Sequence, residues 1–390
     1  MKDKFAVSMF GQKRLSREGG IEIVVKELST RMARDGCQVT CYNRSGHHVS
    51  GAEYDKKTEY DGICQKFVPT IERKGLAAVS SSFFAALYSA FGKYDIVHSH
   101  ELFHSGMVLL TAKLAGVKHR FVHAHNWSDD DGSGRQSFIR KLYNSVMRKW
   151  ILRYGTEFCA CSTLAGEFLY GEKKTHDEKY HLIFNSVDTS KFIENFDKIE
   201  TGEYCDKEWT NVIQVGRFSP IKNQLFTAEI ARELKLRGKK IRILCVGNNG
   251  NEYEQQVREA IKKYGIEEHM LLLGVRKDID VLMRKARAFL LPSLYEGMPL
   301  VMIEAQAAGL PCITADTYSH EVDFGIGYVN WMKLNQSYVD WANAIEAAVK
   351  MEHAEKQKVQ QAIEKNGFDS RVFARRLCDL YEQAMERTSL

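Results

Sequence analysis

The stretch FLLPSLYEGMPLVMIEAQAAGLPCITAD, residues 289–316, has the pattern of a strand, a loop, a helix and a second strand. Pro299 suits the first turn of that helix, because a proline there loses no intrahelical hydrogen bond. Gly309 suits the left-handed residue that ends a helix, and Pro311 prevents the helix from continuing. The stretch therefore predicts one β-α-β unit of a parallel sheet.

The same pattern continues on both sides of this stretch, because short apolar strands alternate with amphipathic helices along most of the chain. This alternation is typical of parallel sheets with helices on both faces. A polar, strand-poor segment at residues 191–209 separates two such series. We therefore predict an α/β fold with two Rossmann-like, doubly wound domains, which cover residues 1–190 and 191–365. Residues 366–390 are expected to form a C-terminal helix that packs back toward the first domain.

The expected strands are short in both halves. In the first half they cover residues 4–10, 38–42, 96–99, 120–124, 157–161 and 181–184. In the second half they cover residues 212–215, 241–246, 270–273, 288–291 and 312–314. Ligands of such sheets bind beyond the carboxyl ends of the strands, so the loops that follow strands are where we expect the site.

Composition narrows the setting in which the protein works. The chain has nine cysteines without a paired spacing and no secretory leader, which predicts a reducing cytoplasm. Residues 75–92 carry no charge, but their serines favour a partly buried amphipathic helix over a membrane span. The net charge is +5, the excess lies in the first half, and no nucleic-acid motif accompanies it. We therefore expect an anionic membrane surface rather than nucleic acid as a partner.

Two glutamates in the opening stretch are candidate ligand-binding residues. Glu304 interrupts the apolar run 300–308 in the expected helix, and a buried carboxylate needs a partner. The hydroxyls of a ribose would be suitable donors, although a solvated or salt-bridged glutamate explains the pattern equally well. Glu296 lies eight residues earlier, in the loop. A pair of carboxylates also occurs in glycoside hydrolases, but these two are placed to accept hydrogen bonds from hydroxyls rather than to flank one bond.

Two cations and two glycines lie before helices. Arg217 and Lys222 follow the expected strand at residues 212–215, and cations at a helix N-terminus oppose the helix dipole. A nucleotide diphosphate would satisfy both, whereas the alternative is a pair of solvated surface cations. Gly19 and Gly20 precede the first helix, where glycine lets the backbone approach an anion. No GxGxxG accompanies them, so they do not establish a dinucleotide site.

Histidines gather in the first half, at His98, His100, His104, His119, His123 and His125. No cysteine or carboxylate joins them at metal spacing along the sequence, so we expect no metal site. His125 ends a strand before Asn126 and Trp127, and it is predicted to be a hydrogen-bonding residue of the active site. The other five are expected to be core or surface histidines.

Taken together, these residues resemble the family 4 retaining glycosyltransferases of the GT-B fold, of the bacterial surface-polysaccharide type. Seven motifs carry the resemblance and occur in the family's order over nearly the whole chain. They are GGIE (19–22), DIVHSH (95–100), VHAHN (122–126), FNSVD (184–188), VGRFSPIKN (215–223), LLLG (271–274) and EGMPLVMIE (296–304).

The resemblance implies that two domains face a cleft, with the acceptor bound by residues 1–190 and the nucleotide-sugar donor by residues 191–365. It also implies a role for each candidate in donor binding. Arg217 and Lys222 would hold the diphosphate of a nucleotide sugar. Glu304 would bind the ribose, and Glu296 the transferred sugar. The stretch between these glutamates would add contacts from Gly297, Met298, Pro299 and Leu300.

Further implied contacts come from elsewhere in the chain. Gly20 would approach the phosphates, His125 would contact the donor sugar near its reacting carbon, and the backbone of Val275 would meet the base. The chain departs from the family pattern at Ser186 and Asn223, where glycine is common. These two departures bear on hinge geometry and on the donor.

The function expected from the resemblance is retaining transfer without a metal or another cofactor. The donor would be a UDP-sugar rather than GDP-mannose, and a hexose or N-acetylhexosamine would pass to a glycan or lipid-linked saccharide. The enzyme would work in surface polysaccharide biosynthesis, such as that of an exopolysaccharide or capsule. It would be cytoplasmic and peripheral on the inner face of the cell membrane. The alternatives are a nucleotide-sugar epimerase of similar fold and a non-catalytic nucleotide-sugar-binding protein.

Overall fold

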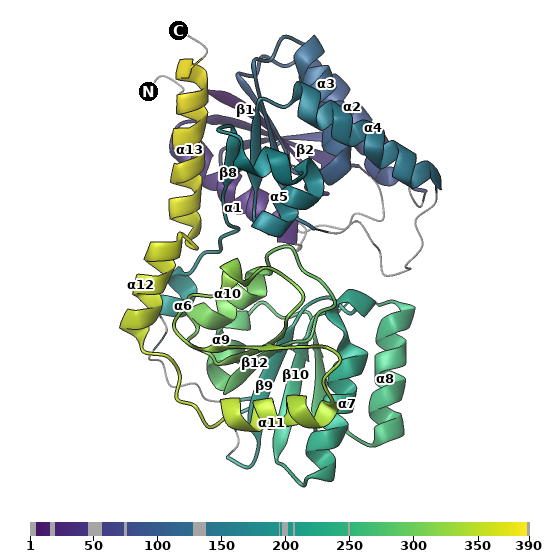
Figure 1. Ribbon diagram of the computed structural model, residues 1–390, viewed down its shortest axis with the longest axis vertical. Coiled ribbons are helices and arrows are strands. Elements are labelled where there is room, and N and C mark those ends of the chain that lie inside the picture. The colour runs from purple at the N-terminus through teal and green to yellow at the C-terminus, as the bar shows by residue number, and fades with distance from the viewer. Residues whose placement is uncertain are drawn as a thin grey trace. The chain divides into compact units, whose positions relative to one another are not determined.

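The chain forms two compact units, each built around a largely parallel sheet (Figure 1). The computed structural model describes residues 5–15, 20–45, 57–73, 76–127, 138–194, 196, 202–205, 207–248 and 250–387. Unit 1 comprises Met1–Asp188 together with Gly367–Leu390, and unit 2 comprises Thr189–Asn366. The predicted α/β class with two doubly wound sheets is confirmed.

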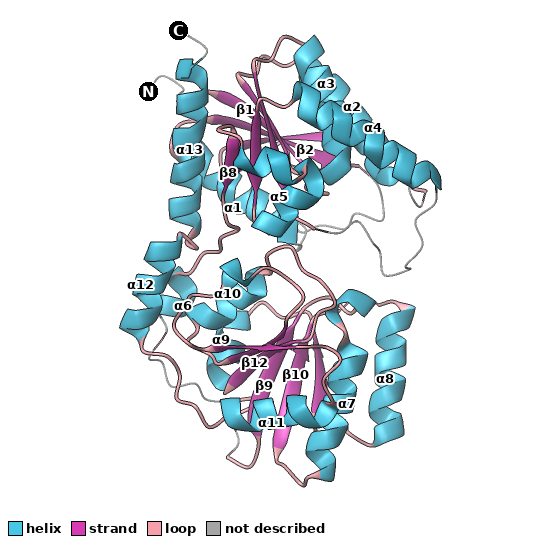
Figure 2. Ribbon diagram, in the orientation of Figure 1, coloured by secondary structure: helices cyan, strands magenta, loops and turns pink. Residues whose placement is uncertain are grey.

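The sheet of unit 1 has eight strands in the order β3-β4-β2-β1-β5-β6-β7-β8. Figure 2 shows the strands of both units in magenta. The strands are β1 Ala6–Phe10, β2 Gln38–Arg44, β3 Glu59–Tyr60, β4 Ile63–Val68, β5 Ile96–Ser99, β6 His119–Ala124, β7 Glu157–Ala160 and β8 Tyr180–Leu182. All pairs are parallel except β3 with β4. The sequence did not predict β3 and β4, because β3 is a two-residue strand at the sheet edge and β4, next to it, alternates buried with exposed side chains instead of forming an apolar run.

Helices cover both faces of this sheet. They are α1 Gly20–Arg34, α2 Ala77–Ala90, α3 Ser105–Leu114, α4 Phe138–Tyr154, α5 Thr163–Tyr170 and α13 Ser370–Arg387, with 3-10 turns η1 Leu102–His104 and η2 Glu172–His176. Val97 packs with residues of α2 and α3, whereas His98, its neighbour on β5, contacts Tyr381 of α13. Because adjacent strand residues face opposite sides, α13 covers the face away from α2 and α3.

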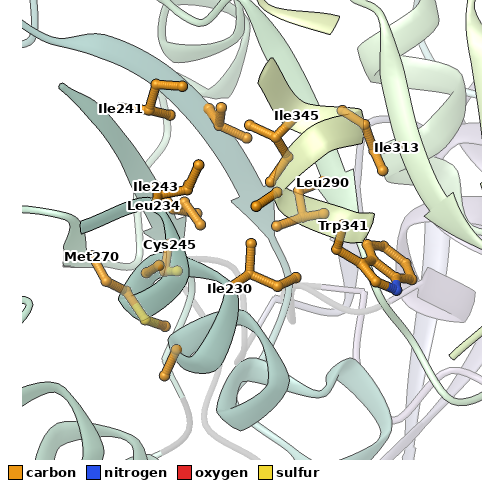
Figure 3. Packing of buried hydrophobic residues seen from close by; sticks show 14 of the residues in the cluster. Ile230, Leu234, Ile241, Ile243, Cys245, Met270, Leu290, Ile313, Trp341 and Ile345 are labelled. Atoms are coloured by element: carbon orange, nitrogen blue, oxygen red, sulfur yellow. The ribbon is translucent and has the colours of Figure 1, made fainter. Parts of the chain in front are cut away.

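The sheet of unit 2 has six parallel strands in the order β11-β10-β9-β12-β13-β14. They are β9 Thr210–Val215, β10 Ile241–Val246, β11 Met270–Gly274, β12 Ala288–Leu291, β13 Cys312–Ala315 and β14 Val329–Met332. Around them are α6 Ser190–Glu194, η3 Pro220–Lys222, α7 Gln224–Leu236, α8 Glu252–Tyr264, α9 Ile279–Lys285, α10 Leu300–Ala307, η4 His320–Val322, α11 Tyr338–Ala348 and α12 Lys356–Asn366. Ile243, Leu290 and Trp341 belong to the buried core between this sheet and its helices (Figure 3).

The helix signals of the opening stretch are found where the sequence placed them, with one shift. Gly309 has φ +75°, the left-handed conformation expected after a helix. Pro299 is the N-cap of α10 rather than its first helical residue, because its ψ of 115° is extended and the helix begins at Leu300.

The uncharged segment at residues 75–92 contains α2, whose serines bond to backbone carbonyls of the preceding turn. Phe83, Leu87 and Tyr88 of α2 are exposed, whereas Ala85 and Ala86 belong to the core. Gly75 lies outside the described residues. Among the described residues, no helix combines the length and the apolar character needed to cross a membrane.

Candidate active site

The carboxyl ends of β9 and β12 form the centre of the candidate site in unit 2. These strands are neighbours, and the chain continues from β9 toward one sheet edge and from β12 toward the other. Such a switch point is where ligands bind to sheets of this type. Lys222 follows β9 and Glu296 follows β12, and their Nζ and Oε1 atoms lie 2.5 Å apart. The fold thus joins two residues that are 74 positions apart in the sequence.

The turn that carries Lys222 is held from several sides. Asn223 has φ +55°, the left-handed region that asparagine tolerates better than other non-glycine residues. This conformation explains how Asn223 replaces the glycine that is common in the family. The Asn223 side chain donates to the carbonyl of Pro292, and the buried Gln214 side chain donates to the carbonyl of Lys222. The lysine is therefore positioned before any ligand binds.

Close backbone packing explains two glycines beside this turn. A Cβ at Gly247, which has φ +136°, would lie 2.1 Å from the carbonyl oxygen of Gly216. A Cβ at Gly216 would lie 3.1 Å from the Lys222 side chain. Larger residues at either position would displace the loops that follow β9 and β10. Arg217, next to Gly216, is exposed.

Glu304 lies half-buried on α10, whose N-terminus is at the same edge of the sheet. Burial raises the pKa of its carboxyl to about 7, and Lys191 partly opposes this rise. Its carboxylate has no hydrogen bond or ion pair with the described residues, so the salt-bridged alternative does not hold within them. A half-buried acceptor without a donor is the condition under which a ligand hydroxyl would be stabilising.

The remaining predicted donor contacts are distributed over both units. Gly297, Met298, Pro299 and Leu300 are all buried. Val275, which follows β11, is 60% exposed. Gly20 begins α1 in unit 1, and a Cβ there would meet nothing within 4 Å, so no described neighbour requires a glycine. Gly19 lies outside the described residues.

His125 is buried at the end of β6, and both of its ring nitrogens are occupied. Nδ1 lies 3.0 Å from Oδ1 of Asn185, and Nε2 lies 2.7 Å from Nδ1 of His100. Burial lowers the pKa of His125 to about 4, although the bond to Asn185 opposes this, so the ring is neutral at pH 7. Nδ1 therefore donates to Asn185 and Nε2 accepts from His100. A bound sugar would contact a nitrogen of His125 only if one of these bonds opened.

Four histidines form a buried group around this bond, because β5 and β6 are neighbours and each carries two on one face. The rings of His98, His100, His123 and His125 lie against one another with centroids 4.3 to 5.6 Å apart. Burial lowers the pKa of each ring. Neutral, buried rings on the face covered by α13 fit the expected role of core histidines for three of the four.

Strand pairing brings a cysteine to these histidines, although none accompanies them at metal spacing along the sequence. Cys159 of β7 pairs with His123 of β6, so the fold places a thiol next to a histidine that lies 36 residues away in the sequence. Ligand atoms of His98, His123 and Cys159 lie within 4.8 Å of one another, as do those of His100, His123 and His125. Linear spacing did not show this grouping, because it arises from strand pairing.

Sequence reasoning also missed two partners of the predicted site residues. Asn185 lies in the quoted FNSVD motif but was given no role, although it sets the tautomer of His125. Lys191 lies in the expected linker, yet its charge acts on Glu304. Each lies at least 60 positions from its partner, and no periodicity within one segment reports such a distance.

The family models described as "Glycosyltransferase Family 4" and "Glycosyl transferases group 1" match residues 18–191 and 198–368. EpsF of Bacillus subtilis, a protein named as a glycosyltransferase, is 30% identical over 380 residues, which cover 95% of this chain and 94% of EpsF.

Two further proteins extend the comparison. The UDP-Gal:alpha-D-GlcNAc-diphosphoundecaprenol alpha-1,3-galactosyltransferase of Escherichia coli is 30% identical over 277 residues, which cover 66% of this chain and 68% of that protein. The crystal structure of Anabaena HepE in complex with UDP matches with a TM-score of 0.72 at 16% identity, over 97% of this chain and 100% of that one.

The chain therefore belongs to glycosyltransferase family 4 and is a glycosyltransferase of the GT-B fold. This result confirms the family and the fold class expected from the motifs. The relatives do not favour the epimerase or the non-catalytic alternative.

Proposed function

We propose that this glycosyltransferase takes a hexose or N-acetylhexosamine from a UDP-sugar and transfers it to a glycan or lipid-linked saccharide during surface polysaccharide assembly. The observation that carries the donor assignment is the half-buried carboxylate of Glu304 without a partner among the described residues, at the same sheet edge as Lys222 and Glu296. The name of the Escherichia coli relative, with its UDP-Gal donor and lipid-linked acceptor, supports the substrate classes.

In this proposal the residues of unit 2 divide the donor between them. Lys222 and Arg217 neutralise the diphosphate, and the ribose hydroxyls donate to Glu304. Lys222 would exchange its bond with Glu296 for one with phosphate, which would leave Glu296 free to accept from the sugar hydroxyls. Gly20 and His125 remain predicted donor contacts of unit 1, and Val275 a predicted contact of the base.

Transfer would proceed with retention of the anomeric configuration and without a metal. The bond between the anomeric carbon and the phosphate oxygen breaks, and the acceptor oxygen bonds to that carbon on the same face. The acceptor proton passes to the departing phosphate oxygen, so no covalent nucleophile is needed. Arg217 and Lys222 would stabilise the charge that develops on the diphosphate.

We also propose that unit 1 docks on an anionic membrane through α4. Only Met147 and Ile151 of this 17-residue helix are buried, whereas Phe138 and Ile139 are 79% and 78% exposed. Lys141 and Lys149 are also exposed and form no ion pair with described residues. An exposed apolar and basic helix is the pattern of an interfacial helix. This finding weakens the alternative that the α4 stripe serves mainly the domain's own core.

A ligand panel tests the donor assignment. UDP and UDP-sugars are expected to raise the melting temperature of the purified enzyme by mass action, and GDP and GDP-mannose to raise it less. Transfer to lipid-linked saccharides would then be followed by NMR of the product, with an α-linkage expected from an α-linked donor. A larger shift with GDP-mannose, or an inverted product, would contradict the donor or the mechanism respectively.

A further inference from the structure

Three neighbouring strands of unit 1 carry side chains that can bind a metal on one face of the sheet. His98 lies on β5, His123 on β6 and Cys159 on β7, and all three are fully buried. The register pairs His123 with Cys159. It pairs His98 with Phe121, which lies two residues before His123. The three side chains therefore point to the same face, the one that α13 covers, and their ligand atoms lie within 4.8 Å of one another.

The histidines of this group have ring nitrogens without a hydrogen-bond partner. Nε2 of His98 and both ring nitrogens of His123 are buried and unpartnered among the described residues. The backbone of Ile183 interacts with the His123 ring, but not within hydrogen-bond geometry of either nitrogen. The thiol of Cys159 is free and equally buried. A buried nitrogen that has lost its hydration without gaining a partner is destabilising, and a bound ion would supply that partner.

The second nitrogen of His98 is held by the helix that covers the sheet. Nδ1 of His98 lies 2.5 Å from the hydroxyl oxygen of Tyr381 on α13. When Nδ1 donates its proton to that oxygen, Nε2 presents a lone pair to the group. Metal-binding histidines commonly have this arrangement, in which an outer partner fixes the tautomer and the direction of the ring. Tyr381 therefore acts as a positioning residue for His98.

A second group of histidines is less suited to a metal. Ligand atoms of His100, His123 and His125 also lie within 4.8 Å of one another. Both nitrogens of His125 are occupied, however, by His100 and by Asn185, so a metal would break one of these bonds. In the first group, the rings of His98 and His123 are nearly parallel, at 7°, and His123 must turn about its Cβ–Cγ bond to face an ion. Within the described part of the chain, no hydrogen bond opposes that turn.

We propose that His98, His123 and Cys159 bind one soft metal ion, Cu⁺ or Zn²⁺, in a structural site that joins β5, β6 and β7. Imidazole and thiolate are ligands that both ions prefer. On binding, the thiol releases its proton and the thiolate sulfur bonds to the ion. The ion takes no part in sugar transfer, because Arg217 and Lys222, the proposed contacts of the diphosphate, belong to unit 2.

The size and the charge of the group both bear on the ion. Metal–ligand bonds of about 2.0 to 2.3 Å place ligand atoms roughly 3.3 to 3.8 Å apart, so the ion occupies the space between them after they approach by at most about 1.5 Å. It therefore needs no separate cavity. With two neutral imidazoles and one thiolate, the Cu⁺ complex is neutral, whereas the Zn²⁺ complex keeps a buried positive charge. Because a buried charge is costly, we expect Cu⁺ to bind more tightly.

Metal titration of the full-length enzyme tests the site. The metal-free protein is titrated under anaerobic, reducing conditions, with Cu⁺ in competition with bicinchoninate and, separately, with Zn²⁺ in competition with a chromophoric chelator. The wild type is expected to bind one equivalent. Tyr381→Phe should weaken binding about 10- to 100-fold, as for the loss of an outer partner, and Cys159→Ala by more than about 100-fold. Cys312→Ala is the matched control, because Cys312 is a buried strand thiol that belongs to no such group of described residues.

X-ray absorption of the metal-loaded wild type gives a readout that needs no variant, in case Cys159→Ala does not fold. It should show one sulfur at about 2.3 Å and nitrogens at about 2.0 Å from the ion. A spectrum without sulfur, equal affinity in Cys159→Ala and wild type, or no binding of either ion by the wild type overturns the site. Wild-type affinity in Tyr381→Phe would also count against it, because His98 would then not be a ligand held by Tyr381.

Discussion

The two units share a parallel α/β architecture but place their charges differently. At the strand ends of unit 2, a lysine and a glutamate form an ion pair beside an exposed arginine. At the strand ends of unit 1, neutral histidines are stacked and buried, and exposed cations lie on the surface of α4 instead. A shared fold thus carries a lysine–glutamate ion pair at the strand ends of one unit and stacked neutral rings at the strand ends of the other. Four predictions test that difference.

The largest effect is expected from the exposed cations of α4. Replacing four of them with Gln should lower the affinity for anionic vesicles up to about 1000-fold at low salt, because each cation contributes ~1 kcal/mol to binding. Vesicle sedimentation measures this affinity. The four are Arg140, Lys141, Lys149 and Arg153. Arg148 is excluded because it donates to the carbonyl of Phe168 and lies over the ring of Phe103.

A matched control carries the same charge change in unit 2, at Lys262, Lys263, Lys350 and Lys365. It should leave vesicle binding close to that of the wild type. Wild-type binding should also weaken as salt rises, because surface electrostatics are screened. Equal affinity for neutral vesicles would remove the membrane proposal and would leave the donor site untouched.

The charged edge of unit 2 is tested by Arg217→Ala and Lys222→Ala. Each removes a charge-assisted contact of ~1.5 to 3 kcal/mol with the diphosphate, so transfer should fall about 10- to 150-fold. Lys239→Ala is the control, because Lys239 forms an ion pair with Glu346 on the surface of the same unit. Turnover near that of the wild type in either edge variant would disprove the diphosphate assignment.

The pH dependence of stability tests the half-buried Glu304. Its pKa is raised to about 7 in the folded chain, so the folded state binds more protons than the unfolded state, and stability falls as pH rises from about 4.5 to 7. Glu304→Gln removes this loss. Relative to wild type, the variant should therefore gain about 1 to 2 kcal/mol between pH 5 and pH 8 in urea unfolding.

Glu346→Gln is the control of opposite sign. Lys239 and Arg237 lower the pKa of Glu346, so its stabilising effect is present above the unfolded pKa and is lost as pH falls. That variant should lose stability at pH 8. A flat pH dependence for Glu304→Gln relative to wild type would show that the Glu304 carboxyl is not destabilised by burial.

The smallest effect is expected from chelation. Transfer should persist in excess EDTA, because Arg217 and Lys222 would neutralise the diphosphate without a metal. The measurement is the initial transfer rate with and without EDTA. Loss of activity that magnesium or manganese restores would contradict this expectation. It would show that a metal ion neutralises the diphosphate.

Local sequence was sufficient for most strands and for the special backbone positions. Strands Ile96–Ser99, Ile241–Val246 and Ala288–Leu291 have the expected bounds, because buried parallel strands are apolar runs. The edge strands β3 and β14, and β4 next to β3, were missed, since many of their side chains are only partly buried. The linker also contains a short helix, α6, whose apolar residues are too few for a periodic signal.

The candidate site was predictable in its residues but not in its contacts. The cations after β9 and the glutamates after β12 were identified from their position behind strands. Their ion pair was not, because the adjacency of β9 and β12 depends on strand order. The bond between His100 and His125 and the thiol beside His123 depend in the same way on the pairing of β6 with β5 and with β7. The bond from His125 to Asn185 depends on a loop 60 residues further along the chain.

Two long helices of unit 1, α4 and α13, differ in a property that the sequence did not predict, namely how much of each helix is buried. Both α4 and α13 are amphipathic, yet α4 buries two of its residues and α13 buries eight. The sequence determined that each would be a helix with an apolar stripe, because helix propensity and periodicity are local properties. Only the tertiary structure decided that the α13 stripe packs on the sheet while much of the α4 stripe stays exposed, because the surface that covers a stripe comes from distant parts of the chain.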